Sequence, residues 1–205
     1  SYISKSIDGG LSFISTADID DYSWMLNSCP STTPRGVVLG DSLCVVKRSG
    51  ASGNNEIVYN NVNATDLNYS YNRNIDLVAG ALQDYPEISS NGDTIVVVWQ
   101  DNRTGLQNCH MSYSFQGASN LGGSISFTDS SMAGQKLDPD VVYSNGKIHL
   151  VYLDNTQHSI VYVKASIDGT NNINELNNIQ PNNIIKITDI LGRETKQTNQ
   201  PLFYI

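Results

Sequence analysis

A repeat of about 53 residues constrains the fold of this 205-residue chain more than any other feature of its sequence. Pro34, Pro86 and Pro139 lie 52 and 53 residues apart, and each begins a short strand-like segment, a turn with glycine and a second apolar segment. The dipeptides Asn91-Gly92 and Asn145-Gly146 favour tight turns between antiparallel strands. Each unit therefore opens with a predicted β-hairpin.

A third segment with alternating polar and apolar residues follows in each unit, at 56–60, 108–115 and 159–165. The tetrapeptide at 6–9 recurs at 166–169, an offset of 160 residues that corresponds to three units of about 53 residues. Units of roughly 40 to 50 residues with four short antiparallel strands are typical of propeller blades. We therefore predict an all-β fold, a β-propeller of four-stranded antiparallel blades, with about three to three and a half blades in this chain.

The same register divides the chain into a partial propeller, 1–180, and a C-terminal segment, 181–205. The expected blade parts are 1–29, 30–82, 83–135 and 136–180. Propellers close into rings because closure removes exposed edge strands. An incomplete ring therefore predicts either a longer parent protein or self-association that completes the propeller.

Charge and hydropathy exclude several classes of partner. The chain has 12 basic and 20 acidic residues, a formal net charge of -8 that repels phosphate backbones and anionic lipids. No apolar run approaches the roughly 18 residues that a membrane span needs. We expect no nucleic acid partner, no membrane span and no cofactor, and the three scattered histidines predict no metal site.

The three cysteines, Cys29, Cys44 and Cys109, have no C-x-x-C spacing, which argues against a zinc ribbon or a redox motif. Their odd number leaves at least one thiol free. Two interpretations of the others remain: a Cys29–Cys44 disulfide in an oxidising compartment, or buried free thiols that pack as small apolar side chains.

The segment Ser-Ile-Asp-Gly-Gly-Leu-Ser-Phe at 6–13 resembles the Asp-box, or BNR repeat, of sialidase-like propellers. The five positions that define the pattern all match: Ser6, Asp8, Gly10, Ser12 and Phe13. In that family the box is the hairpin between the third and fourth strands of a blade, away from the ligand, and its aromatic residue fills the space between adjacent sheets. The resemblance implies a six-bladed parent and a structural role for Asp8, rather than a catalytic or calcium-binding one. A second copy, with Ser166 and Asp168, lacks the second glycine and the aromatic residue.

The C-terminal segment breaks the blade pattern. Residues 186–195 and 201–205 resemble the C-terminal sorting signal of the type IX secretion system of Bacteroidetes. This resemblance implies an extracellular or cell-surface protein. The alternative interpretation is that residues 184–190 form the outer strand of the last blade.

The propeller register also predicts which residues face a ligand, because the loops from fourth to first strands and from second to third strands share one end of the blades. The candidates at this end are Arg35, Arg48, Trp99, Asp101, Arg103 and Asp154. Residues 99–105 combine an aromatic ring, a carboxylate and a guanidinium on one loop. Asp101 and Arg103 either contact a ligand or pair with each other and stiffen the loop.

Three functions fit these patterns. Sialidases need three arginines, an acid/base aspartate and a tyrosine–glutamate pair, and residues 1–180 have four arginines, none in the Arg-Ile-Pro order of that family. No catalytic residue is therefore assigned. The favoured function is a secreted propeller that binds a polysaccharide or a surface partner. The alternatives are an exo-sialidase-like glycoside hydrolase with most catalytic residues outside this chain, and a non-catalytic assembly or adhesion module.

Overall fold

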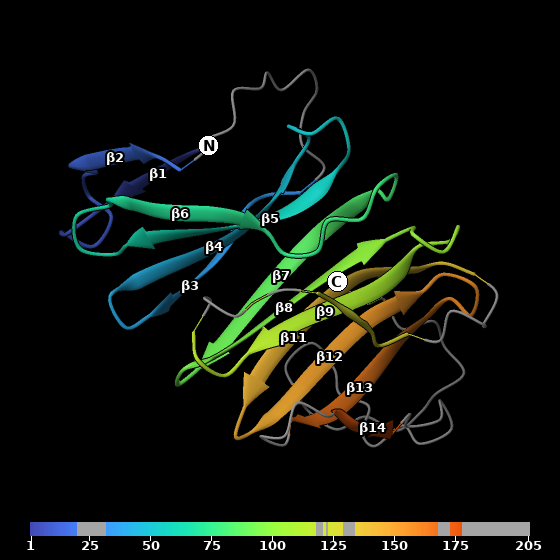
Figure 1. Ribbon diagram of the computed structural model, residues 1–205. Coiled ribbons are helices and arrows are strands. Elements are labelled where there is room, and N and C mark those ends of the chain that lie inside the picture. Colours follow the sequence, from blue (N-terminus) through green and yellow to red (C-terminus); the bar gives the residue numbers. More distant parts are fainter. Residues whose placement is uncertain (20–31, 118–120, 122, 129–133, 168–172, 178–205) are drawn as a thin grey trace, which may run out of the picture.

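The computed structural model describes residues 1–19, 32–117, 121, 123–128, 134–167 and 173–177. These residues form three four-stranded antiparallel sheets and one two-stranded sheet (Figure 1). The predicted all-β fold of four-stranded antiparallel blades is thereby confirmed. Within the same residues, no helix has the length and apolar character required to cross a membrane.

The strands follow the order expected of consecutive blades. The two-stranded sheet consists of β1 (Tyr2–Lys5) and β2 (Ser15–Asp18). The second sheet consists of β3 (Arg35–Leu39), β4 (Ser42–Ser49), β5 (Glu56–Asn63) and β6 (Tyr69–Asn74). The third consists of β7 (Gln83–Asn91), β8 (Thr94–Asp101), β9 (Asn108–Ser114) and β10 (Ile125–Ser126). The fourth consists of β11 (Lys136–Ser144), β12 (Lys147–Asp154), β13 (Ser159–Ile167) and β14 (Ile173–Asn177).

Each four-stranded sheet opens with the predicted hairpin, closed by two residues. In the fourth sheet these are Asn145 and Gly146, as expected, both with positive φ. In the third sheet Asn91 instead ends β7 and pairs with Thr94, so the turn begins at Gly92, one residue later than the Asn-Gly signal predicts. Gly92 adopts a φ of 57°, which glycine tolerates without steric cost.

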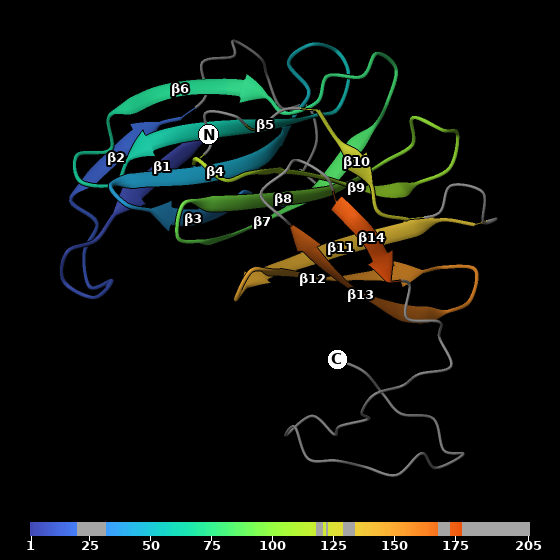
Figure 2. The same ribbon diagram turned by 60° about the horizontal axis from the view of Figure 1, so that its bottom comes forward.

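The sheets stack face to face in chain order (Figure 2). Strand β7 contacts β3, β4 and β5 of the preceding sheet, and β11 contacts β7, β8 and β9. The first strands of successive sheets therefore lie next to one another, and we call β3, β7 and β11 the inner strands. The fourth strand lies at the opposite edge of each sheet. This radial repetition is the blade arrangement of a propeller.

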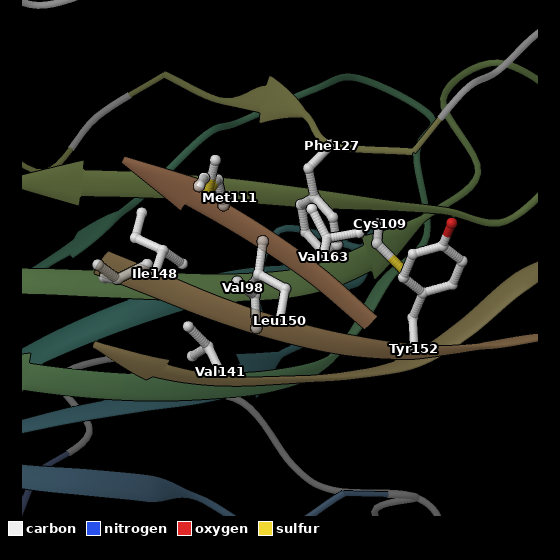
Figure 3. Packing of buried hydrophobic residues seen from close by; sticks show 11 residues of the cluster. Val98, Cys109, Met111, Phe127, Val141, Ile148, Leu150, Tyr152 and Val163 are labelled. Atoms are coloured by element: carbon white, nitrogen blue, oxygen red, sulfur yellow. The ribbon is translucent and has the colours of Figure 1, made fainter. Parts of the chain in front are cut away.

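The apolar core lies between sheets rather than within one. All eight residues of β8 are buried, because alternate side chains enter opposite interfaces. Val97 and Trp99 pack toward the preceding sheet, whereas Val96 and Val98 pack toward the following one, against Leu150 and its neighbours (Figure 3). Each such burial contributes about 1.5 to 3 kcal/mol to the free energy of unfolding.

Strand β12 differs from β8, although it is the equivalent strand of its own sheet. Its burial alternates, with Ile148, Leu150 and Tyr152 buried and the residues between them partly exposed. Among the residues that the structure describes, those of the neighbouring sheet therefore cover one face of this last sheet.

The structure distinguishes between the two interpretations of the cysteines, a disulfide or buried free thiols. Cys44 and Cys109 are free and buried, and Cys44 Sγ accepts a hydrogen bond of 3.0 Å from the Tyr59 hydroxyl. The disulfide between Cys29 and Cys44 is therefore not formed, and Cys44 packs as a small apolar side chain in the core. Cys29, Asp168 and the C-terminal segment 181–205 lie outside the described residues.

Candidate functional site

The inner strands β7 and β11 begin with the same irregularity. Pairing with the next strand shifts between Asp84 and Glu87 in β7, and between Leu137 and Asp140 in β11. The residue before each proline, Tyr85 or Asp138, has a positive φ, 54° and 49°. Such bulges redirect the side chains of a strand and occur next to binding sites. Tyr85 is half-buried and Asp138 is exposed, so both reach the surface here.

The residue after each repeat proline carries a charge in all three sheets. These residues are Arg35, Glu87 and Asp140, at equivalent positions of β3, β7 and β11. Arg35 Nε donates a hydrogen bond of 2.5 Å to Glu87 Oε1, and Arg35 also donates to the Thr33 hydroxyl. Arg35, the first residue of β3, thus connects two neighbouring sheets.

Arg48 forms the second ionic contact between the same two sheets. Its Nη1 lies 2.8 Å from Asp84 Oδ2, and Asp84 Oδ1 also accepts hydrogen bonds from the Thr32 hydroxyl and the Tyr85 amide. At the next interface, Gln100 Oε1 accepts a hydrogen bond of 2.9 Å from the Asp138 amide. Gln100 is the repeat equivalent of Arg48, so the contact recurs with different chemistry.

Asp101 is the most enclosed of the candidate residues. Its side chain is fully buried, and its carboxylate accepts hydrogen bonds from Arg103 Nε, from the Arg103 amide and, at 3.3 Å, from Trp99 Nε1. His110 Nε2 lies 3.2 Å from Asp101 Oδ1. Burial would raise the pKa of Asp101, but its bonds to His110 and Arg103 outweigh that effect and hold the pKa well below its usual range.

Arg103 extends this cluster to the loop between β6 and β7. Its Nη1 lies 2.7 Å from Asp76 Oδ2 and 2.9 Å from the Ser124 hydroxyl, which in turn donates to Asp76 at 2.5 Å. Asp101 and Arg103 therefore pair with each other, and their charges are used within the protein. Trp99 has no exposed surface and stacks on His110, so its ring is part of the core rather than a surface platform.

Asp154 occupies the same place in the last sheet that Asp101 occupies in the third. Its Oδ2 lies 3.1 Å from Nζ of Lys136, which is also buried. Burial would raise the pKa of Asp154, but the amides of Gln157 and Thr156 and the Lys136 ammonium together lower it. Ser49, Asp101 and Asp154 each accept a hydrogen bond from the amide two residues later. The loop after the second strand of each four-stranded sheet thus begins with the same turn, in which a side-chain oxygen accepts a hydrogen bond from the amide two residues later.

The N-terminal hairpin holds residues 6–12, which lie in the segment that resembles an Asp-box, in a closed hydrogen-bonded turn. Asp8 accepts bonds from the Ser6 hydroxyl at 2.7 Å and from the Ser12 amide and hydroxyl at 2.9 and 2.6 Å. These bonds, those from Ser12 first, lower the pKa of Asp8 below its usual range. The Gly10 amide donates to the Ser6 hydroxyl at 2.8 Å. The turn uses the Asp8 carboxylate to hold its own backbone.

Phe13 of the hairpin and Ser166 of the second copy are the remaining described residues at the pattern positions of the two similar segments. The resemblance implies that Phe13 fills the space between adjacent sheets. Phe13 is instead 64% exposed, so this implication is wrong for the present hairpin. Ser166, in the second copy, accepts a hydrogen bond of 2.6 Å from Lys147 Nζ.

In the described part of the chain, no cluster of three or more His, Cys, Asp or Glu side chains is arranged to hold a metal ion.

The six predicted loop-end residues thus fall into three groups. Arg35 and Arg48 bridge the second and third sheets, Trp99, Asp101 and Arg103 form the buried cluster, and Asp154 pairs with Lys136. The sequence prediction missed Tyr85, whose only signal was its position before a repeat proline. It also missed the role of His110, which carries no motif.

Comparison of the sequence with protein-family models and with curated proteins gives no match. Among solved structures, the chain is similar to a thermostable family-43 glycoside hydrolase, with 14% identity, a TM-score of 0.47 and coverage of 68% of this chain and 54% of that one. It is also similar to a family 117 glycoside hydrolase of the marine bacterium Zobellia galactanivorans, with 15% identity, a TM-score of 0.40 and coverage of 71% and 55%. The chain spans about half the length of these two proteins. Likenesses this distant assign no activity to it.

Proposed function

We propose that this chain is a carbohydrate-binding propeller module that acts outside the cell or at its surface. Its binding site is the start of the inner strands, which we call the inner rim. The rim consists of Arg35, Tyr85, Glu87, Asp138 and Asp140.

The observation that supports the proposal is the left-handed backbone conformation of Tyr85 and Asp138. Left-handed φ values cost a residue other than glycine about 1 to 2 kcal/mol, and the proline that follows restricts the backbone further. Two neighbouring blades keep this conformation at equivalent positions of their inner strands. Backbone strain of this kind clusters at ligand sites, because it places side chains where regular strands cannot.

The chemistry of the rim suits a neutral sugar. Tyr85 offers a flat apolar ring with a polar tip, and the charged groups of Arg35, Glu87 and Asp140 can donate to and accept from hydroxyl groups. The rim has three carboxylates and one guanidinium, and the whole chain carries a net charge of -8. Both charges disfavour polyanionic ligands and favour uncharged glycans.

A glycan array probed with the full chain tests this proposal, followed by titration calorimetry with the retained glycan. We expect Tyr85→Ala and Asp140→Asn each to weaken binding by about tenfold or more. Tyr71→Ala is the matched control, since Tyr71 is an exposed tyrosine on β6, the fourth strand of its sheet. Failure to retain any neutral glycan, or equal affinity for wild type and Tyr85→Ala, would contradict the proposal.

The same glycans also separate binding from catalysis. We expect the chain to leave a bound oligosaccharide intact during prolonged incubation, as measured by the release of reducing ends. Hydrolysis that disappears in Asp138→Asn would instead assign the chain to the glycoside hydrolases.

A further inference from the structure

The backbone amides of Tyr85 and Asp138 fall outside the regular pairing of their sheets. At each bulge, two residues of the inner strand face a single residue of the next strand. The second of the two is a proline, which has no N–H group, so Tyr85 or Asp138 supplies the amide at its bulge. Backbone amides inside folded proteins almost always find an acceptor. At both bulges this acceptor is a side-chain oxygen.

Gln100 supplies the acceptor for Asp138. The Asp138 amide donates to Gln100 Oε1 over 2.9 Å. Gln100 is buried and is the last residue but one of β8, whereas Asp138 belongs to β11 of the following sheet. A side chain that packing fixes therefore holds the left-handed residue of β11 from the neighbouring sheet.

Arg48 acts on Tyr85 by way of the Asp84 carboxylate. Asp84 Oδ1 accepts hydrogen bonds from the Tyr85 amide and from the Thr32 hydroxyl, each over 2.9 Å. Asp84 Oδ2 lies 2.8 Å from Arg48 Nη1, and the two side chains are only 15% and 17% exposed. A charge-assisted hydrogen bond in such a place is strong and directional. Arg48, the last residue but one of β4, therefore fixes the carboxylate that holds Tyr85 of the following sheet.

The repeat gives Arg48 and Gln100 the same position in their sheets. Each is the last residue but one of a second strand, and each acts on the residue before the proline of the next inner strand. Their chemistry differs, because Arg48 is a cation that acts through a carboxylate and Gln100 is a neutral amide that acts directly. Two unlike side chains thus hold the same left-handed conformation at equivalent places. What the two interfaces share is the held backbone.

We propose that Arg48 and Gln100 are positioning residues of the inner rim, an inference that rests on the proposed function. Gln100 keeps Asp138, and Arg48 keeps Tyr85, in the conformation that a glycan meets. Without them, each rim residue can relax toward the extended backbone that a residue before proline prefers. A glycan would then have to order the rim as it binds, which lowers its affinity. The shape of the rim thus depends on contacts between successive sheets.

NMR of the isotope-labelled full chain tests the holding role without any glycan. A left-handed φ brings the amide proton of a residue close to its own Hα, which gives a strong nuclear Overhauser effect between the two. We expect Gln100→Met to weaken this effect at Asp138 and to leave it unchanged at Tyr85, and Arg48→Met to do the reverse. Arg48→Lys, which keeps the cation, should retain the wild-type effect at Tyr85. Wild-type effects in both methionine variants would overturn the proposal.

Titration calorimetry with the retained neutral glycan tests the consequence for binding. We expect Gln100→Met and Arg48→Met each to weaken binding by about fivefold or more, and Arg48→Lys to recover most of the loss. Ser89→Ala is the matched control, because Ser89 Oγ accepts the Tyr143 amide over 2.9 Å between β7 and β11, an inter-sheet bond of the same kind outside the rim.

The control and the two readouts separate the possible failures. An equal loss of affinity in Ser89→Ala would overturn the proposal, since any weakened interface would then have the same effect. Wild-type affinity in both methionine variants, despite altered nuclear Overhauser effects, would also overturn it. Failure to retain any neutral glycan would contradict the proposed function, and the NMR comparison would still decide whether Arg48 and Gln100 hold the two residues.

Discussion

The guanidinium of Arg103, in the loop between β8 and β9, lies 2.7 Å from the carboxylate of Asp76, in the loop between β6 and β7. Arg103 also pairs with Asp101, whose side chain is fully buried. One arginine therefore neutralises the buried carboxylate at the end of β8 and a second carboxylate in the loop that connects two sheets. Arg103 therefore connects the β8–β9 loop to the β6–β7 loop.

Replacement of Arg103 by methionine should lower the free energy of unfolding by about 3 kcal/mol. The reason is that Asp101 keeps its buried charge but loses its principal cation. Asp76→Asn, which preserves shape, should cost about 1 kcal/mol. Urea unfolding followed by tryptophan fluorescence measures both, with Lys164→Met as an exposed control. Equal stabilities of Arg103→Met and wild type would contradict a connecting role.

Acid should destabilise the protein partly through Asp101. Its pKa is lowered in the folded state, so its charged form contributes stability above the ordinary aspartate value of about 4, and this contribution is lost as the pH falls below it. Asp101→Asn should therefore be less stable than wild type at pH 7 and should lose less stability between pH 5 and pH 2. Urea unfolding at a series of pH values provides the test. Parallel curves for the two proteins would show that Asp101 does not contribute.

The thiols of Cys44 and Cys109 should be unreactive in the folded protein. Burial raises the pKa of both groups, which leaves little thiolate, and their side chains have almost no exposed surface. Treatment with iodoacetamide at pH 8, followed by peptide mass spectrometry, should find both unmodified in buffer and modified in urea. Rapid alkylation of either cysteine under native conditions would show that its interface opens.

The sequence predicted the sheets because their signals are local and repeated. The prolines at 34, 86 and 139 and the turns that follow them mark the same hairpin three times. The one error in register, at Asn91, arose because a glycine follows that residue in an Asn-Gly pair, although the turn uses Gly92 and Asp93. Repetition thus made the strand order predictable and left single turns uncertain by one residue.

The candidate site was harder to predict, because exposure depends on the neighbouring sheet. Trp99 lies on the side of β8 that the preceding sheet covers. The sequence around Trp99 does not indicate that another sheet buries it. The strain at Tyr85 and Asp138 was equally hidden, since a residue before proline usually adopts an extended conformation. The pairing of Asp101 with Arg103 was one of two open alternatives, and only the structure supplies its distances.

Because β8 is buried on both sides, each central sheet completes the cores of two neighbours at once. Evolution can then lengthen or shorten such a chain only in whole repeats of about 53 residues, since any partial excision would strip two apolar interfaces together. Variation in length among natural versions of this domain should accordingly come in discrete steps, with smaller insertions confined to the connecting loops.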